Sequence, residues 1–133
     1  MTEGLLPEWQ NVPKDISKHL GFCYIIYNQH TGRKYIGKKQ FWRKIRRKPL
    51  KGTKRVRLDN VESDWKKYWG SCAVLQQDIQ DIGYHHFSRS IISCWDCKWD
   101  LAYEELRLQV EHGVLFKKEY YNGIINIRLC KKK

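Results

Sequence analysis

Acidic residues are absent from a long part of this 133-residue chain: none lies between Ile16 and Leu58, where Lys and Arg occur fourteen times. The whole chain has 26 Lys and Arg against 14 Asp and Glu, a formal net charge of +12. Residues 33–67 alone hold fifteen basic and three acidic residues and so account for the entire excess. Such a concentration of positive charge favours a polyanionic partner, either nucleic acid or a membrane surface.

Long hydrophobic runs are also missing, and no stretch approaches the length that crosses a bilayer. The first residues, MTEGLLPEWQ, lack the basic and apolar regions of a signal peptide. Binding to a membrane surface requires an amphipathic helix, but "KIRRKPLKGTKRVRL" contains the helix breakers Pro49 and Gly52. We therefore expect a soluble, cytoplasmic protein with no membrane partner.

The five cysteines are odd in number and show no framework of a small disulfide-rich domain. We expect them to be reduced thiols. The "CWDC" pair, Cys94 and Cys97, supplies two of the four ligands of a structural zinc site. The nearby His85 and His86 do not complete a known zinc-module spacing. Free thiols are therefore expected, and metal binding by Cys94 and Cys97 is the alternative.

The order of secondary structure is predicted from turn signals and hydrophobic periodicity. Residues 21–28 form a strand, "NQHTG" a turn, and "RKYIGKK" the return strand of a hairpin. A basic insertion follows over about residues 40–61, with a short helix expected before Pro49. "SCAVLQQDIQDIG" predicts a helix with Ser71 as its N-cap and Gly83 at its end.

"HFSRSIISC" predicts a third strand, and "DLAYEELRLQVEHG" a second long helix with Leu101 and Leu108 on one face. Together these elements predict an α/β (α+β) layer sandwich, with a small, three-stranded, mainly antiparallel sheet flanked by helices. The expected organisation is an N-terminal arm (1–20), a single domain (21–129) and a basic tail (130–133).

Two short signatures stand eleven residues apart, measured from Tyr24 in "FCY" (22–24) to Tyr35 in "YIG" (35–37). A glutamate-bearing helix and a terminal "YN" follow them. This pattern resembles the GIY-YIG endonuclease superfamily over residues 21–128, and most of all small phage-encoded, free-standing relatives of homing endonucleases. The resemblance departs from the family at Phe22, which takes the place of a glycine, although Gly21 precedes it.

The resemblance implies a metal-dependent DNA endonuclease that hydrolyses phosphodiester bonds with Mg²⁺ or Mn²⁺. A carboxylate that holds one divalent ion neutralises charge on the phosphorus and on the leaving oxygen. Glu104 and Glu105 both qualify, because they straddle the Leu101–Leu108 face equally. Glu105 is the expected catalytic residue and metal ligand on resemblance alone, with Glu104 as the alternative.

The resemblance also places both signature tyrosines near the scissile phosphate, with Tyr24 as the expected base and Tyr35 as a positioner of water or phosphate. A free phenol, with a pKa of about 10, is a poor base at neutral pH. The cations of Lys38 and Lys39 would favour its ionised form. Without the resemblance, two tyrosines packed in a half-buried hairpin are the ordinary interpretation.

A phosphate-clamping arginine lies about ten residues beyond the second tyrosine in many members of the superfamily, which corresponds here to Ile45. Of the arginines that flank it, Arg46 is the first candidate and Arg43 the second. Asn122 matches the terminal asparagine that steadies the site through hydrogen bonds. It also begins an "NG" pair, so a plain turn is the competing interpretation.

Double-stranded DNA is the expected partner, bound by a monomer or a homodimer. Its phosphates are expected to contact the Lys and Arg side chains of the basic insertion and of the end of the strand before it. These are Lys38, Lys39, Arg43, Lys44, Arg46, Arg47, Lys48, Lys51, Lys54, Arg55 and Arg57. The alternative function is a catalytically weak or inactive DNA- or RNA-binding protein, of the repressor or packaging type. A phage-encoded enzyme of this kind would act in the cytoplasm of the host cell.

Overall fold

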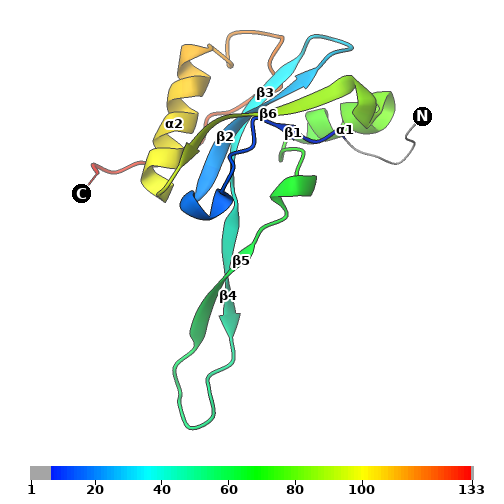
Figure 1. Ribbon diagram of the computed structural model, residues 1–133. Coiled ribbons are helices and arrows are strands. Elements are labelled where there is room, and N and C mark those ends of the chain that lie inside the picture. The colour runs from blue at the N-terminus through cyan, green and yellow to red at the C-terminus, as the bar shows by residue number, and fades with distance from the viewer. Residues whose placement is uncertain (1–6, 133) are drawn as a thin grey trace.

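The computed structural model describes residues 7–132, in which one four-stranded sheet lies between helices (Figure 1). The sheet order is β1-β6-β2-β3, formed by Trp9–Gln10, Phe87–Trp95, Gly21–Asn28 and Lys34–Gln40. Only β1 runs parallel to its neighbour. The helices are α1 (Ala73–Ile82) and α2 (Lys98–Glu111). The predicted α+β layer architecture is therefore confirmed.

The sheet has one strand more than the three predicted, because Trp9–Gln10 of the N-terminal arm pairs with β6. Two residues carry too little hydrophobic periodicity to be recognised as a strand. Arg89 of β6 holds the arm in place: its buried guanidinium lies between the rings of Trp9 and Trp69 and donates a hydrogen bond to the Pro7 carbonyl at 2.6 Å. The remainder of the predicted arm, residues 1–6, and Lys133 of the basic tail lie outside the described residues.

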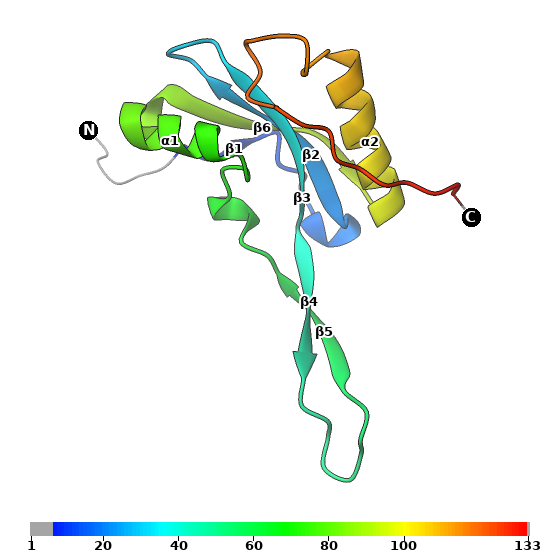
Figure 2. The same ribbon diagram turned by 180° about the vertical axis from the view of Figure 1, so that it is seen from behind.

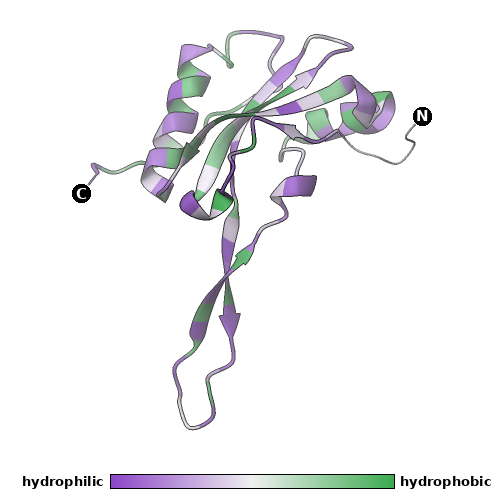
Figure 3. Ribbon diagram, viewed as in Figure 1, coloured by the Kyte–Doolittle hydropathy of each residue, from purple (hydrophilic) through white to green (hydrophobic). Residues whose placement is uncertain are grey.

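Alternation along the strands divides the apolar side chains between two cores, one on each face of the sheet. Phe22, Tyr24 and Ile26 of β2 pack with Leu75 and Ile79 of α1. The side chains between them face the other way and join a core whose members are Cys23, Ile36, Leu101, Leu108, Val114 and Tyr120. Figure 3 shows the apolar residues of both helices interrupted by polar ones, as expected for helices with one buried face.

Helix α1 begins differently from the prediction. Cys72, and not Ser71, is its N-cap residue, and no side chain caps the helix there. The Ser71 hydroxyl instead lies 3.5 Å from the Tyr35 hydroxyl. Gly83 ends the helix with φ +106°, in agreement with the prediction.

The basic insertion forms an antiparallel hairpin, β4 (Trp42–Arg47) and β5 (Arg57–Glu62), that projects away from the sheet (Figure 1). The short helix predicted before Pro49 is wrong. A helix there would place like charges four residues apart, Arg43 above Arg47 and Lys44 above Lys48, which is unfavourable. The extended form separates these cations and gives β4 a paired partner strand.

The C-terminal segment covers the outer edge of β3 (Figure 2). The Lys34 backbone donates a hydrogen bond to the Glu119 carbonyl at 2.6 Å, and the Tyr121 N–H donates to the Lys34 carbonyl at 2.7 Å. Asn122 follows and bonds to Ile36 with both ends of its amide. These bonds satisfy backbone groups that an open edge strand would leave exposed.

Substitution of Gly21 tests how closely β2 packs against its neighbours. A Cβ at this position would lie 2.5 Å from the Lys39 carbonyl oxygen, a backbone atom that cannot rotate away. We expect Gly21→Ala to lower the free energy of unfolding by about 1–3 kcal/mol. Gly123→Ala, where nothing lies within 4 Å of the added Cβ, is the control and should stay within about 0.5 kcal/mol in urea denaturation. Equal stability of both variants would contradict the close approach.

Candidate active site

The signature tyrosines Tyr24 and Tyr35 lie on the same face of the β2–β3 hairpin, with ring centroids 6.2 Å apart. Gly37 is directly opposite Tyr24 in the sheet. A Cβ on Gly37 would lie 2.6 Å from the Tyr24 hydroxyl oxygen and 3.1 Å from the Tyr35 ring. The glycine of "YIG" is therefore required because the two phenols occupy the space of its missing side chain.

The two phenols differ in exposure. Tyr24 is 1% exposed and packs edge-on against Tyr68. Burial, with a smaller contribution from Tyr68, raises the pKa of Tyr24 well above its ordinary value. Burial also raises the pKa of the half-buried Tyr35, while its hydrogen bond with Ser71 opposes the rise. Both side chains are therefore neutral hydrogen-bond donors at neutral pH.

A pocket of about 310 Å³ opens at the covered edge of β3. It brings together Tyr35 from β3, Glu105 from α2 and Asn122 from the C-terminal segment. Its wall is completed by Ser71, Cys72, Gln109, Tyr121 and residues 123–127. The carboxylate and one signature tyrosine of the predicted site thus share one cavity, and Tyr24 lies in the core beneath Gly37.

The two candidate glutamates have different environments. Glu104 is 8% exposed, and Arg107 forms an ion pair with it on the same helix. Glu105 lines the pocket, where burial raises its pKa and the Lys38 cation partly opposes that rise. The geometry therefore favours Glu105, because its carboxylate faces open space and Glu104 already has a cationic partner.

A divalent cation fits this donor set. Mg²⁺ keeps several water ligands and is usually bound through one or two carboxylates together with substrate phosphates. Glu105 supplies such a carboxylate, and the Tyr35 and Ser71 hydroxyls lie around the same cavity. Within residues 7–132, no three His, Cys, Asp or Glu side chains form a larger metal-ligand cluster, Cys94 and Cys97 included.

Asn122 and Gln109 hold the Ile36 backbone in place. The Asn122 amide nitrogen donates to the Ile36 carbonyl at 2.8 Å, and its oxygen accepts from the Ile36 N–H at 3.1 Å. Gln109 of α2 donates to the same carbonyl at 3.1 Å. Asn122 thus acts on the site through the strand between Tyr35 and Gly37.

Tyr68 contacts the predicted site residue Tyr24, and sequence reasoning did not name it. Its ring packs against Tyr24, and the Lys39 ammonium lies 4.2 Å from its centroid. Asp64 holds that ammonium with an ion pair of 2.7 Å. The signal was present in "SDWKKYWGS", which places Asp64 and Tyr68 at the two ends of one 3₁₀ turn, Trp65–Lys67.

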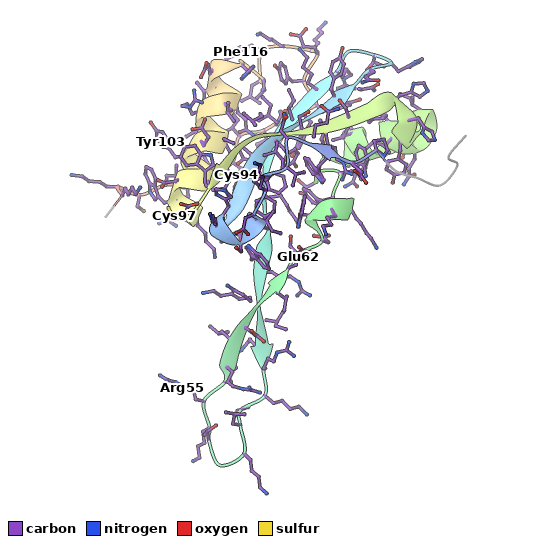
Figure 4. The ribbon with its side chains drawn as sticks, viewed as in Figure 1. Arg55, Glu62, Cys94, Cys97, Tyr103 and Phe116 are labelled. Atoms are coloured by element: carbon purple, nitrogen blue, oxygen red, sulfur yellow. The ribbon has the colours of Figure 1, made fainter. Side chains whose placement is uncertain are left out.

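The two candidate arginines do not line the pocket of Tyr35 and Glu105. Arg43 lies at the root of the hairpin, in a separate hollow with Lys38 and Lys39. Arg46 lies further out, opposite Leu58. Figure 4 shows the hairpin side chains pointing away from the body of the protein on both sides. Lys38 is the cation beside Glu105.

Comparison with known proteins agrees with this geometry. Residues 8–125 match the family model described as "Putative endonuclease segE, GIY-YIG domain". The fold and site define a GIY-YIG nuclease domain, and the chain belongs to this SegE-type family of GIY-YIG endonuclease domains. Comparison with curated proteins and with solved structures gives no match. Within residues 7–132, no helix has both the length and the apolarity that a membrane span needs.

The raised pKa of Glu105 predicts a pH-dependent cost to stability. The folded protein holds this proton more tightly than the unfolded chain, whose glutamate has a pKa of about 4.3. Stability therefore falls as pH rises from that value through the raised folded pKa. We expect Glu105→Gln to have a higher Tm than the parent protein at pH 7, with the difference vanishing near pH 4.

Thermal denaturation across pH 4–7 measures this effect. Glu119→Gln, at an exposed glutamate outside the pocket, is the matched control and should leave Tm unchanged over the same range. A lower Tm for Glu105→Gln at pH 7 would mean that the ionised carboxylate stabilises the fold.

Proposed function

We propose that this chain is a metal-dependent DNA endonuclease that hydrolyses phosphodiester bonds with Mg²⁺ or Mn²⁺. The observation that carries the proposal is the shared pocket of Tyr35 and Glu105, with Tyr24 directly behind Gly37. A protein that only binds nucleic acid gains nothing from a partly buried carboxylate where a phosphate would lie, because the two negative charges repel. Membership of an endonuclease family points the same way.

Glu105 would hold the divalent cation, with the Tyr35 and Ser71 hydroxyls near it. The ion, when bound, supplies Lewis-acid polarisation of the phosphoryl oxygens and stabilises the leaving oxygen. Tyr35 reaches the pocket and would orient the attacking water or a phosphate oxygen through its hydroxyl. Asn122 keeps Tyr35 and Gly37 in register through the Ile36 backbone.

The division of roles between the tyrosines follows from burial. Tyr24 was expected to be the base, yet its hydroxyl is enclosed beneath Gly37 and its raised pKa keeps the proton on the phenol. We therefore propose that Tyr35 contacts the water directly. Tyr24 then has a supporting role, as a neutral hydrogen-bond donor behind it. Tyr24 regains the role of base only if the bound ion and Lys38 lower its pKa.

Incubation with supercoiled plasmid tests the proposal. Purified protein with Mg²⁺ is expected to convert the plasmid to nicked or linear forms, and chelation should stop this. Glu105→Ala should lower the rate at least ~100-fold, since it removes the ligand of the ion, with DNA binding intact or tighter. Glu104→Gln, a change of the adjacent carboxylate already paired with Arg107, is the control and should cut at nearly the parent rate.

The alternative is a catalytically weak or inactive DNA- or RNA-binding protein, of the repressor or packaging type, on the same scaffold. Phe22 at a family glycine position and the absence of an arginine in the pocket favour it. The plasmid experiment separates the two functions. Unchanged nicking by Glu105→Ala would refute the metal assignment, and no nicking by the parent protein would leave the binding function.

A second experiment identifies the cation that clamps the phosphate. Arg46 and Arg43 remain candidates by resemblance, but Lys38 is the cation beside Glu105. We expect Lys38→Ala to slow cleavage by ~100-fold at saturating DNA, because it removes a charge at the reacting phosphate. Arg46→Ala should weaken DNA binding and leave the saturated single-turnover rate within about threefold. The opposite result would assign the clamp to the hairpin arginine.

The proposed setting is that of a phage-type enzyme, acting as a monomer or homodimer on double-stranded DNA in the cytoplasm of the host cell. The cations proposed to touch DNA phosphates are those of β3 and the hairpin. All of them lie on or beside one projecting arm, whose first strand begins at Trp42, seven residues after Tyr35.

A further inference from the structure

The two faces of the β4–β5 hairpin have different chemistry. Residues directly opposite each other in an antiparallel pair share a face, and successive pairs alternate. Lys44 pairs with Asn60 and Arg46 with Leu58, so these four side chains share one face, beyond the Trp42–Glu62 pair that lies on the same face at the root. We call this the open face. The other face carries Arg43 with Val61, Ile45 with Asp59, and Arg47 with Arg57, and we call it the braced face.

Two of the three arginines on the braced face bond within the hairpin. Arg47 donates to Asp59 at 3.0 Å, and Arg57 donates to the Lys48 carbonyl at 3.2 Å. Ile45 and Val61 are half-buried between these side chains. The braced face therefore stiffens the ribbon from within and leaves fewer donors for a ligand.

The open face has the opposite character. Lys44, Arg46 and Asn60 are exposed, and none has a side-chain hydrogen bond or ion pair within the described residues 7–132. Leu58 between them is 65% exposed. An exposed apolar side chain beside three polar ones that have no protein partner fits a ligand surface that presents donors or acceptors together with a methyl group.

The major groove of B-form DNA is such a surface. It admits a two-stranded β-ribbon, and its base edges accept from Lys or Arg at guanine, pair with Asn at adenine and offer the thymine methyl to apolar side chains. The deep, narrow groove of duplex RNA excludes the same ribbon. The open face carries one side chain for each of these contacts, and the hairpin projects away from the sheet and the helices (Figures 1 and 2).

The root of the hairpin provides a place for the phosphate backbone. Lys44 and Asn60 line a hollow of about 490 Å³ shared with Lys18 and Lys98. The one carboxylate in this hollow, Asp96, is paired with His19 at 3.1 Å. Positive charge therefore flanks the open face where the ribbon meets the domain.

We infer that the β4–β5 hairpin enters the major groove of DNA and reads a short sequence through its open face, formed by Lys44, Arg46, Leu58 and Asn60. The inference rests on the proposed function, which supplies the DNA substrate. Two strand residues span about 6.6 Å, so the open face reads about 2–4 base pairs. Arg46 is nine residues from Gly37 along an extended chain. The base pairs that the open face reads therefore lie within ~30 Å, or about nine base pairs, of the cut.

Selection of bound sequences from a randomised duplex library tests the inference without cleavage, in the Glu105→Ala background. We expect a short enriched sequence that contains guanine and adenine. Lys44→Ala/Arg46→Ala should lose the guanine preference by at least about 5- to 150-fold, the range that one such contact provides. Asn60→Ala, which changes no charge, should lose the adenine preference and leave the salt dependence of binding unaltered.

Lys51→Ala/Lys54→Ala is the charge-matched control, because it removes two exposed cations from the loop between β4 and β5 and leaves the braced face intact. We expect it to reduce the salt dependence of binding by the same amount as the open-face pair and to keep the enriched sequence. All variants should retain the parent Tm, since the hairpin lies outside both cores.

Three results would overturn the inference: no enriched sequence, equal loss of preference in both double variants, or equal affinity for duplex RNA. None of them decides the proposed function, which depends on plasmid nicking by the protein with Glu105 intact. Failure of the nuclease assignment is visible separately, as no nicking of plasmid by the parent protein, whatever sequence the Glu105→Ala variant selects.

Discussion

The close approach of β3 to its neighbours at Ile36 and Gly37 is the constraint on which the candidate site depends. The Ile36 backbone is held by Asn122 and Gln109, and the missing side chain of Gly37 makes room for the Tyr24 phenol. Any shift of this strand would move Tyr35, change the wall of the pocket and leave buried polar groups of Asn122 unpaired, which is expensive. The same few hydrogen bonds to the Ile36 backbone thus hold both the fold and the candidate site in place.

Two adjacent glutamates on α2 show how one helix can serve structure and chemistry. Glu104 has a guanidinium partner in Arg107 and contributes to a paired, partly buried network. Glu105 has a half-buried carboxylate whose pKa is raised by burial, and Lys38 opposes this rise only in part. A carboxylate that is incompletely compensated costs stability and attracts cations. This compromise is the one expected for the ion ligand that we propose.

The sequence was sufficient to predict the β2–β3 hairpin, both helices and the spacing of Tyr24 and Tyr35, because each depends on local periodicity or on a turn. It did not separate Glu104 from Glu105, since the pocket that Glu105 lines forms only in the tertiary structure. The i,i+3 pairing of Glu104 with Arg107 on the same helix is a local signal that sequence reasoning did not use. The strand Trp9–Gln10 depends on Arg89, 79 residues or more along the chain, and no local pattern indicates it. The sequence did not predict the hairpin at residues 42–62. Charged residues on both faces of its strands remove the alternation of apolar and polar residues that marks a strand.

Phe22, the departure from the family signature, gains a physical role from its contacts. Its ring lies 4.7 Å from that of Phe41, the single residue between β3 and β4, and Trp65 packs against both. Phe41 is fully buried, and its backbone bonds to Leu20 and Ser63 fix the root of the hairpin. A glycine at position 22 would remove the ring that packs against both Phe41 and Trp65 at this root. The strand that carries Tyr35 and the arm that carries the cations are therefore joined rigidly, so a duplex bound along the arm has a defined position relative to Glu105.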